Sequence, residues 1–123
     1  MNLIGQLVGT LFLSREVAHR AHLATTGTGS FSKHMALGEF YPAVGEHGDT
    51  ITEAYQGRHG LIEIPYLTYD EEEDIIKCLE KQMDDIEELR YNAVDKKDTV
   101  IQNLIDDALA TYLSTLYKLR HLK

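Results

Sequence analysis

FSKHMALGEFYPAVGEHGDTITEAYQ, residues 31–56, is the stretch that decides how this 123-residue chain can fold. Its sequence is poor for a helix, because Gly38, Pro42, Gly45 and Gly48 all lie inside it. Proline in a helix interior costs about 3 kcal/mol, partly through a clash with the carbonyl four residues back. Here that residue is Gly38, which has no side chain to obstruct a local adjustment. We therefore predict one helix over residues 31–56, with a kink at Gly38–Pro42 rather than a break.

Three further helices are predicted around this stretch, over about residues 3–25, 69–92 and 96–121. In each of them apolar residues recur every three or four positions, which is typical of a helix that packs one side against a core. The inward-facing positions include Leu3, Leu7, Leu11, Ala18, Ile75, Leu79, Ile86, Ile101, Leu109, Tyr112 and Leu116.

The predicted helix ends carry residues that commonly cap helices. Glycine often follows a helix in the left-handed conformation, whereas Ser, Thr or Asp often precedes one. The predicted caps are Gly27 after the first helix, Ser30 or Ser32 before the second, Thr68 with Glu71 before the third, and Asp95 or Asp98 before the fourth.

The connection between the second and third helices is GRHGLIEIPYLT, residues 57–68. Twelve extended residues reach at most about 40 Å, and helices of this size are roughly 33 to 39 Å long. The connection can therefore just run the length of a bundle. This predicts an all-α, ferritin-like four-helix bundle with one long crossover between helices 2 and 3, in a single domain over residues 1–123. An up-down-up-down bundle remains the alternative.

Composition excludes several classes of protein. The net charge is −8, and the only basic cluster is at the C-terminus, so we expect no DNA partner. Cys78 is the only cysteine, which excludes an intrachain disulfide and a thiolate metal cluster. No apolar run approaches the roughly 20 residues of a membrane span, so we expect no membrane partner. A soluble, cytoplasmic protein is the resulting expectation.

Four residues form a candidate metal site: His22, His34, Asp49 and Glu53. Two imidazoles and two carboxylates are a good ligand set for a first-row transition metal, iron in particular, with zinc or manganese as substitutes. The predicted helices place His22 and His34 on either side of a short turn. Asp49 and Glu53 are four residues apart and share one face of the second helix.

The spacing also predicts how the site is assembled. Asp49 lies fifteen residues after His34, which is about 22 Å along a continuous helix. One chain therefore cannot bring all four residues to one metal ion. Two copies can, if their second helices lie antiparallel about a twofold axis, so that the histidines of one copy face the carboxylates of the other. The sequence thus predicts a homo-oligomer that is at least a twofold dimer.

The pattern H-x11-H-x14-D-x3-E, with His47, Asp49, Thr50 and Glu53 as an HxDTxxE motif, resembles the ferroxidase signature of the Dps family, or mini-ferritins. The likeness covers about residues 15–60. It implies an intersubunit site that binds iron and oxidises Fe(II), often with hydrogen peroxide, and a twelve-subunit shell that stores the ferric product. The chain is also similar to small phage proteins that look like shortened versions of this fold.

The sequence departs from the family at several points. Leu23 follows the first histidine, where the family usually has tryptophan, and Gly38 replaces a frequent acidic residue. The short connection leaves no room for the family's extra helix, and the lysine-rich DNA-binding tail is absent. A dimer and a dodecameric shell therefore both remain open.

Other readings of the same residues remain. His19, one turn before His22, and His47 are possible supporting residues for the metal ligands, although surface positions explain both. Tyr41 and Tyr55 are expected near the site, where they could intercept oxidising equivalents, and core or interface packing explains them as well. A ferritin-like structural or accessory oligomer, which binds metal without turnover or not at all, is the alternative to a ferroxidase.

Overall fold

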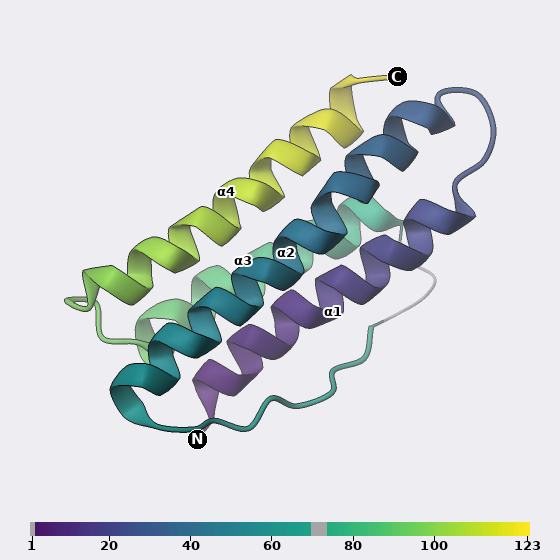
Figure 1. Ribbon diagram of the computed structural model, residues 1–123. Helices are drawn as coiled ribbons and strands as arrows, with labels where there is room; N and C mark the ends of the chain where they lie inside the picture. Colours follow the sequence, from purple (N-terminus) through teal and green to yellow (C-terminus); the bar gives the residue numbers. More distant parts are fainter. Residues whose placement is uncertain (1, 70–73) are drawn as a thin grey trace.

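The computed structural model describes residues 2–69 and 74–123, which form a bundle of four helices (Figure 1). These are α1 (Leu3–Ala24), α2 (Ser30–His59), α3 (Ile75–Ala93) and α4 (Thr99–His121). The expectation of an all-helical four-helix bundle is confirmed. α2 runs without a break past Pro42, so the prediction of one helix through the glycine-rich stretch is also confirmed.

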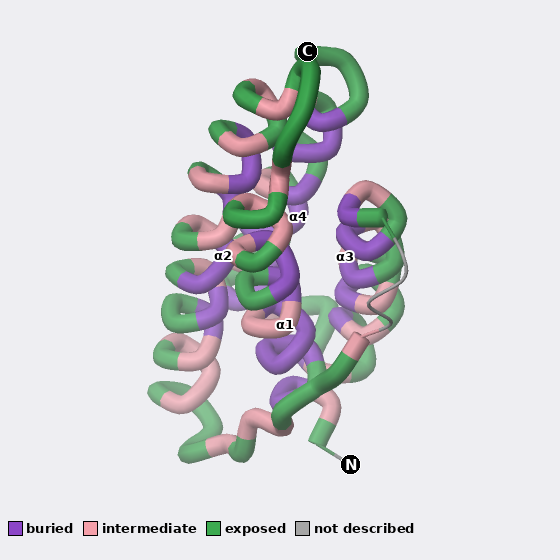
Figure 2. Tube along the Cα trace, turned by 90° about the vertical axis from the view of Figure 1, so that its right-hand side faces the viewer, coloured by how far each residue is buried: buried purple, intermediate pink, exposed green. Residues whose placement is uncertain are grey.

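Each helix packs against two neighbours, and these neighbours run antiparallel. α1 and α4 each contact both α2 and α3. His47 of α2 meets Thr111 of α4 while Glu39 meets Lys118, so the two helices run in opposite directions. The buried residues, purple in Figure 2, lie mostly on the sides of the helices that face one another. This arrangement follows from the apolar positions every three or four residues.

Residues 60–69, part of the connection from α2 to α3, run back along the bundle beside α1 (Figure 1). The Asn2 side chain donates a hydrogen bond to the carbonyl oxygen of Glu63. A methyl group on Gly9 would lie 3.1 Å from the carbonyl oxygen of Pro65, so the two backbones are close there as well. Ile62 and Ile64 pack against the core, whereas Leu61 is exposed. α2 and α3 therefore run in the same direction.

The structure corrects several predicted helix ends. α3 begins at Ile75 rather than near residue 69, because Asp74 caps it by accepting hydrogen bonds from the backbone N–H groups of Ile76 and Lys77. Thr68 lies in the non-helical connection, and its predicted partner Glu71 lies outside the described residues. α2 has Gly29 in the left-handed conformation as its N-cap instead of Ser30 or Ser32. Asp98 caps α4, as one of the two predicted alternatives.

A buried polar network joins three helices at the centre of the core. The Tyr112 hydroxyl of α4 donates to Ser14 Oγ of α1 over 2.6 Å, and Ser14 Oγ donates to Gln82 Oε1 of α3 over 2.6 Å. Burial raises the pKa of Tyr112 well above its ordinary range, and the bond with Ser14 opposes that rise only in part. The phenol therefore stays protonated, and the network fixes the relative positions of the helices.

Close packing between α1 and α2 explains the glycines in α2. A methyl group on Gly48 would lie 2.5 Å from the Phe12 ring, and one on Gly38 would lie 2.8 Å from Cε1 of His22. Side chains of α1 therefore occupy the space that a residue larger than glycine would need. The glycines that make α2 a poor helix by propensity are what allow α1 to pack closely on it.

In the part of the chain that the structure describes, no helix is long and apolar enough to cross a membrane.

Candidate metal half-sites on α1 and α2

His22 and His34 face one another across the turn between α1 and α2. Their rings stack with centroids 3.7 Å apart and planes within 16°. His22 Nδ1 lies 2.7 Å from the carbonyl oxygen of His34, and His34 Nδ1 lies 2.9 Å from the carbonyl oxygen of His22. The pairing is reciprocal, so the two rings and the two backbones hold each other in place. The structure therefore brings together the two histidines that the sequence paired.

These contacts determine which nitrogen of each ring can bind a metal ion. A carbonyl oxygen only accepts hydrogen bonds, so Nδ1 of each histidine carries the proton and donates. In the neutral ring Nε2 then keeps its lone pair. Neither Nε2 has a protein partner among the described residues. A backbone carbonyl on one ring nitrogen is the usual way that proteins orient a histidine that binds metal through the other.

A second pair of rings, one from α1 and one from α2, lies beside the histidine pair. His19 stacks on Tyr41 with ring centroids 4.2 Å apart, and Tyr41 lies 5.6 Å from the His22 ring. The sequence left His19 open between a supporting role for the metal ligands and a surface position, and it left the role of Tyr41 open. Their stacking depends on the register between α1 and α2, which no local pattern gives. The sequence indicated only that His19 and His22, three residues apart, lie on one face of α1.

Asp49 and Glu53 lie on the exposed surface of α2, on a shared face and away from the histidines. Because α2 is continuous, Asp49 lies about 22 Å and Glu53 about 28 Å along the helix from His34. Among the residues that the structure describes, no three His, Cys, Asp or Glu side chains gather closely enough to hold a metal ion. The four predicted ligands therefore lie in two separate groups on one chain, His22 with His34 and Asp49 with Glu53, and each group is a candidate half-site.

His47 faces a different neighbour from the one considered in the sequence. The Thr111 hydroxyl donates to the carbonyl oxygen of Asp107, so the 2.8 Å contact with His47 is a hydrogen bond from His47 Nε2 to Thr111 Oγ1. His47 thus connects α2 to α4. This hydrogen bond holds α2 against α4 and does not orient the Asp49 carboxylate.

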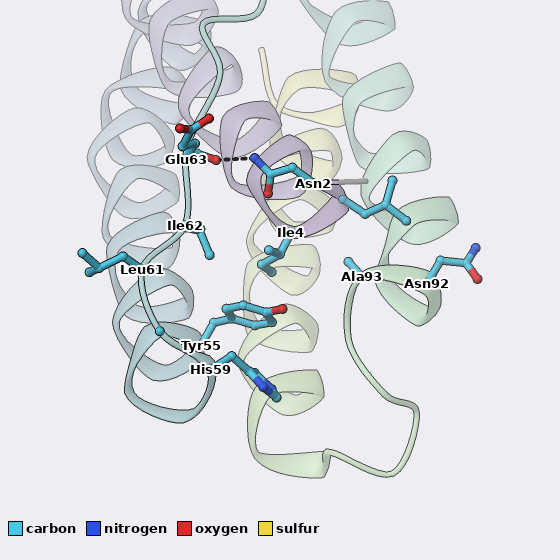
Figure 3. Close-up of a pocket in the computed structure, with 11 residues that line it drawn as sticks. Asn2, Ile4, Tyr55, His59, Leu61, Ile62, Glu63, Asn92 and Ala93 are labelled. Carbon is cyan, nitrogen blue, oxygen red and sulfur yellow. Dashed lines mark hydrogen bonds between the residues drawn. The ribbon is translucent and has the colours of Figure 1, made fainter.

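A pocket of about 520 Å³ lies at the end of the bundle where α1 begins (Figure 3). Tyr55 and His59 from the last turns of α2 lie side by side in it, with ring centroids 4.5 Å apart. None of the predicted metal ligands lines this pocket. Its position is therefore separate from the histidine pair near the other end of α2.

Replacing Gly38 with alanine is expected to lower the free energy of unfolding by about 1 kcal/mol. The new methyl group would push the His22 ring away from His34, which breaks the bond from His22 Nδ1 and the stacking of the two rings, each worth about 1 kcal/mol. That loss exceeds the gain of about 1 kcal/mol in helix propensity. Gly57→Ala is the matched control, because nothing lies near a methyl group there. It should raise stability by about 0.5 to 1 kcal/mol in urea unfolding. Equal stabilisation by both changes would contradict the packing described for His22.

Comparison with known proteins places the chain without assigning an activity. A family of unknown function, DUF5856, matches residues 22–119. The matched range includes all four predicted ligands, His22, His34, Asp49 and Glu53. No curated protein and no solved structure matches the chain. Because the match covers most of the sequence, the chain belongs to the DUF5856 family.

Proposed function

We propose that this protein binds and oxidises Fe(II) in the manner of the Dps family. His22 and His34 of one subunit and Asp49 and Glu53 of its twofold mate would bind the iron. The observation that carries the proposal is the reciprocal bonding of the two histidines, which fixes each Nδ1 on a carbonyl and leaves each Nε2 lone pair without a protein partner. Two stacked imidazoles without such bonds would be equally consistent with simple packing.

The donor set fits iron chemically. Neutral imidazole nitrogens and carboxylate oxygens bind Fe(II) well, and both types also accept zinc or manganese. The two carboxylates would match the charge of a divalent ion, and Glu53, at the outer end of the pair, would be the bridging ligand. Iron is the substrate here: two Fe(II) ions give one electron each to hydrogen peroxide, which takes up two protons and leaves as two water molecules.

The arrangement of the helices supports a ferritin-like relationship. Two antiparallel helix pairs, α1–α2 and α3–α4, are joined by a connection that returns along the bundle, which is the connectivity of ferritin-like folds. Ferritins place a metal site inside each bundle, whereas the centre of this bundle holds Ser14, Gln82 and Tyr112. A site between subunits is therefore the version of the fold that these side chains favour.

Oxidation of Fe(II) tests the proposal directly. The purified chain would be loaded with Fe(II) without oxygen, peroxide or oxygen would be added, and ferric absorbance would be followed. We expect His34→Asn and Glu53→Gln each to lower the oxidation rate at least about tenfold. Even the loss of a residue that only orients a metal ligand usually lowers metal affinity or activity by about this factor. Asparagine can keep the bond from the Nδ1 position while removing Nε2, so the helix turn should stay intact.

Two exposed residues away from the half-sites provide matched controls. His121→Asn changes an exposed histidine of α4, and Glu88→Gln changes an exposed acid of α3. Both should oxidise iron at the rate of the unchanged protein. If the wild-type chain does not oxidise the added Fe(II), the ferroxidase proposal is refuted. Iron binding without oxidation would instead support a structural metal-binding oligomer.

A further inference from the structure

The face of α2 that would meet a second copy has a different character at each end. Close to the histidine pair, large apolar side chains are exposed: Phe31 at 74% and Met35 at 48% on α2, with Leu23 of α1 at 70%. Farther along α2, Glu46, Asp49 and Glu53 are exposed instead. Phe31, Met35, Pro42, Glu46, Asp49 and Glu53 follow one another at helical spacing and form one stripe, the α2 stripe, on the side away from the core.

An antiparallel contact between two copies would bring the unlike ends of the α2 stripe together. The pairing of His34 with Asp49 and Glu53 of a second copy places the twofold axis close to Pro42, midway between them along the helix. Phe31 of one chain then lies opposite Glu53 of the other, and Met35 lies opposite Asp49. Each half-site is incomplete until this contact forms, because no three ligands gather within the described part of one chain.

This contact is unfavourable without a cation. Closing it moves carboxylates from water to positions beside apolar side chains, and an unpaired buried charge carries a large desolvation cost. The net charge of −8 on each chain adds repulsion between the two copies. Each imidazole donates its Nδ1 proton to a backbone carbonyl, so it is the Nε2 lone pairs that would face the carboxylates. The apolar area of Leu23, Phe31 and Met35 has to overcome all of these terms.

A divalent cation reverses the balance. It supplies positive charge at the point where carboxylate oxygens and Nε2 lone pairs meet, so each donor gains a partner. The apolar side chains around the histidines can then be buried without leaving carboxylates unpaired. Because the reciprocal backbone bonds already orient both imidazoles, little order has to be created when the ion binds.

We infer that a divalent cation controls self-association of this chain: the metal-free protein is mainly monomeric, and metal ions bridging the two half-sites assemble the twofold dimer across the α2 stripe. The inference rests on the proposed location of the site, but it concerns assembly rather than oxidation. An ion that binds the dimer and not the monomer shifts the equilibrium toward the dimer. We expect the dimer dissociation constant to fall about 100-fold, in the upper range of coupling between sites in proteins.

Sedimentation velocity of the full chain, first with a chelator and then with Zn²⁺, measures this directly. Zinc accepts the same imidazole and carboxylate ligands and has no redox chemistry, so the readout is mass alone. We expect a monomer with the chelator and a dimer with Zn²⁺ at the same protein concentration. His34→Asn and Glu53→Gln should each stay monomeric with Zn²⁺, and the controls His121→Asn and Glu88→Gln should dimerise as the unchanged protein does.

A mixing experiment identifies the contact as one between half-sites of different chains. His34→Asn keeps its carboxylates and Glu53→Gln keeps its histidines, so one intact site forms when the two variants pair. An equimolar mixture should therefore form a zinc-dependent heterodimer, although neither variant dimerises alone. General aggregation by zinc would give no such complementation.

The remaining outcomes separate this inference from the proposed function. A metal-free chain that is already a stable dimer, unchanged by Zn²⁺, would overturn cation control while leaving the intersubunit ferroxidase intact. A chain that stays monomeric with Zn²⁺ would overturn the inference. If that monomer still oxidised iron, the intersubunit site itself would be wrong. Zinc-dependent dimers that failed to oxidise Fe(II) would uphold the inference and refute the ferroxidase.

Discussion

Replacing Tyr112 with alanine is expected to lower the free energy of unfolding by about 3 to 5 kcal/mol, the usual cost of removing a large aromatic side chain from a core. Tyr112 is fully buried, and its ring packs edge-on against Phe40 with centroids 5.1 Å apart. The change also removes the donor that Ser14 Oγ accepts from, so a polar group of α1 would lose a partner in the core. Urea unfolding followed by circular dichroism measures the loss.

Two companion variants separate the ring from the hydroxyl group. Tyr112→Phe keeps the packing and removes only the bond to Ser14, so it should cost about 1 kcal/mol. Leu113→Ala, on the neighbouring exposed position of α4, should change stability by no more than about 0.5 kcal/mol. If Tyr112→Phe were as damaging as Tyr112→Ala, the hydrogen-bond network rather than the packing would dominate this part of the core. A small effect of Tyr112→Ala would contradict the placement of the ring in the core.

Local pattern was enough to predict most of the helices, and it failed where distant contacts decide. The apolar positions of α1 and α4 gave ends within about three residues of those observed, inside the usual uncertainty of such boundaries. The start of α3 was placed too early because Thr68 reads as a capping residue in sequence. In the structure Ile64 and Tyr69, on either side of it, pack against the core, and residues 60–69 are not helical. That packing depends on contacts with α1, and a local sequence pattern cannot predict such contacts.

The candidate site was predictable in its pairs and not in its details. The short turn between α1 and α2 brings His22 to His34, and helix rise separates both from Asp49 and Glu53, so simple geometry sufficed for these relations. The reciprocal Nδ1 bonds and the stacking of His19 on Tyr41 require the register between two helices. The same register places the His22 ring against Gly38, where a larger residue would collide with it. A helix-propensity argument reads the same glycine only as a cost.

Replacing Pro42 with alanine is expected to raise the free energy of unfolding by about 2 kcal/mol. Proline in a helix interior costs about 3 kcal/mol relative to alanine, and up to about 1 kcal/mol of this is offset because proline also restricts the unfolded chain. Pro42 is exposed, so alanine would lose little packing, and its N–H group would regain the helical bond to the Gly38 carbonyl. Asn103→Ala, at an exposed position of α4, is the matched control and should gain no more than about 0.7 kcal/mol.

The same variant tests why a proline is kept at the centre of the α2 stripe. If a kink at Gly38–Pro42 sets the angle at which two copies of α2 meet, Pro42→Ala should be more stable yet oxidise Fe(II) more slowly and dimerise less with Zn²⁺. Natural proteins often retain a locally unfavourable residue where function requires its geometry. A Pro42→Ala protein that gained stability and kept full oxidation and dimerisation would show that the proline has no role in the site. A loss of stability would instead show that the backbone around residue 42 depends on the fixed geometry of proline.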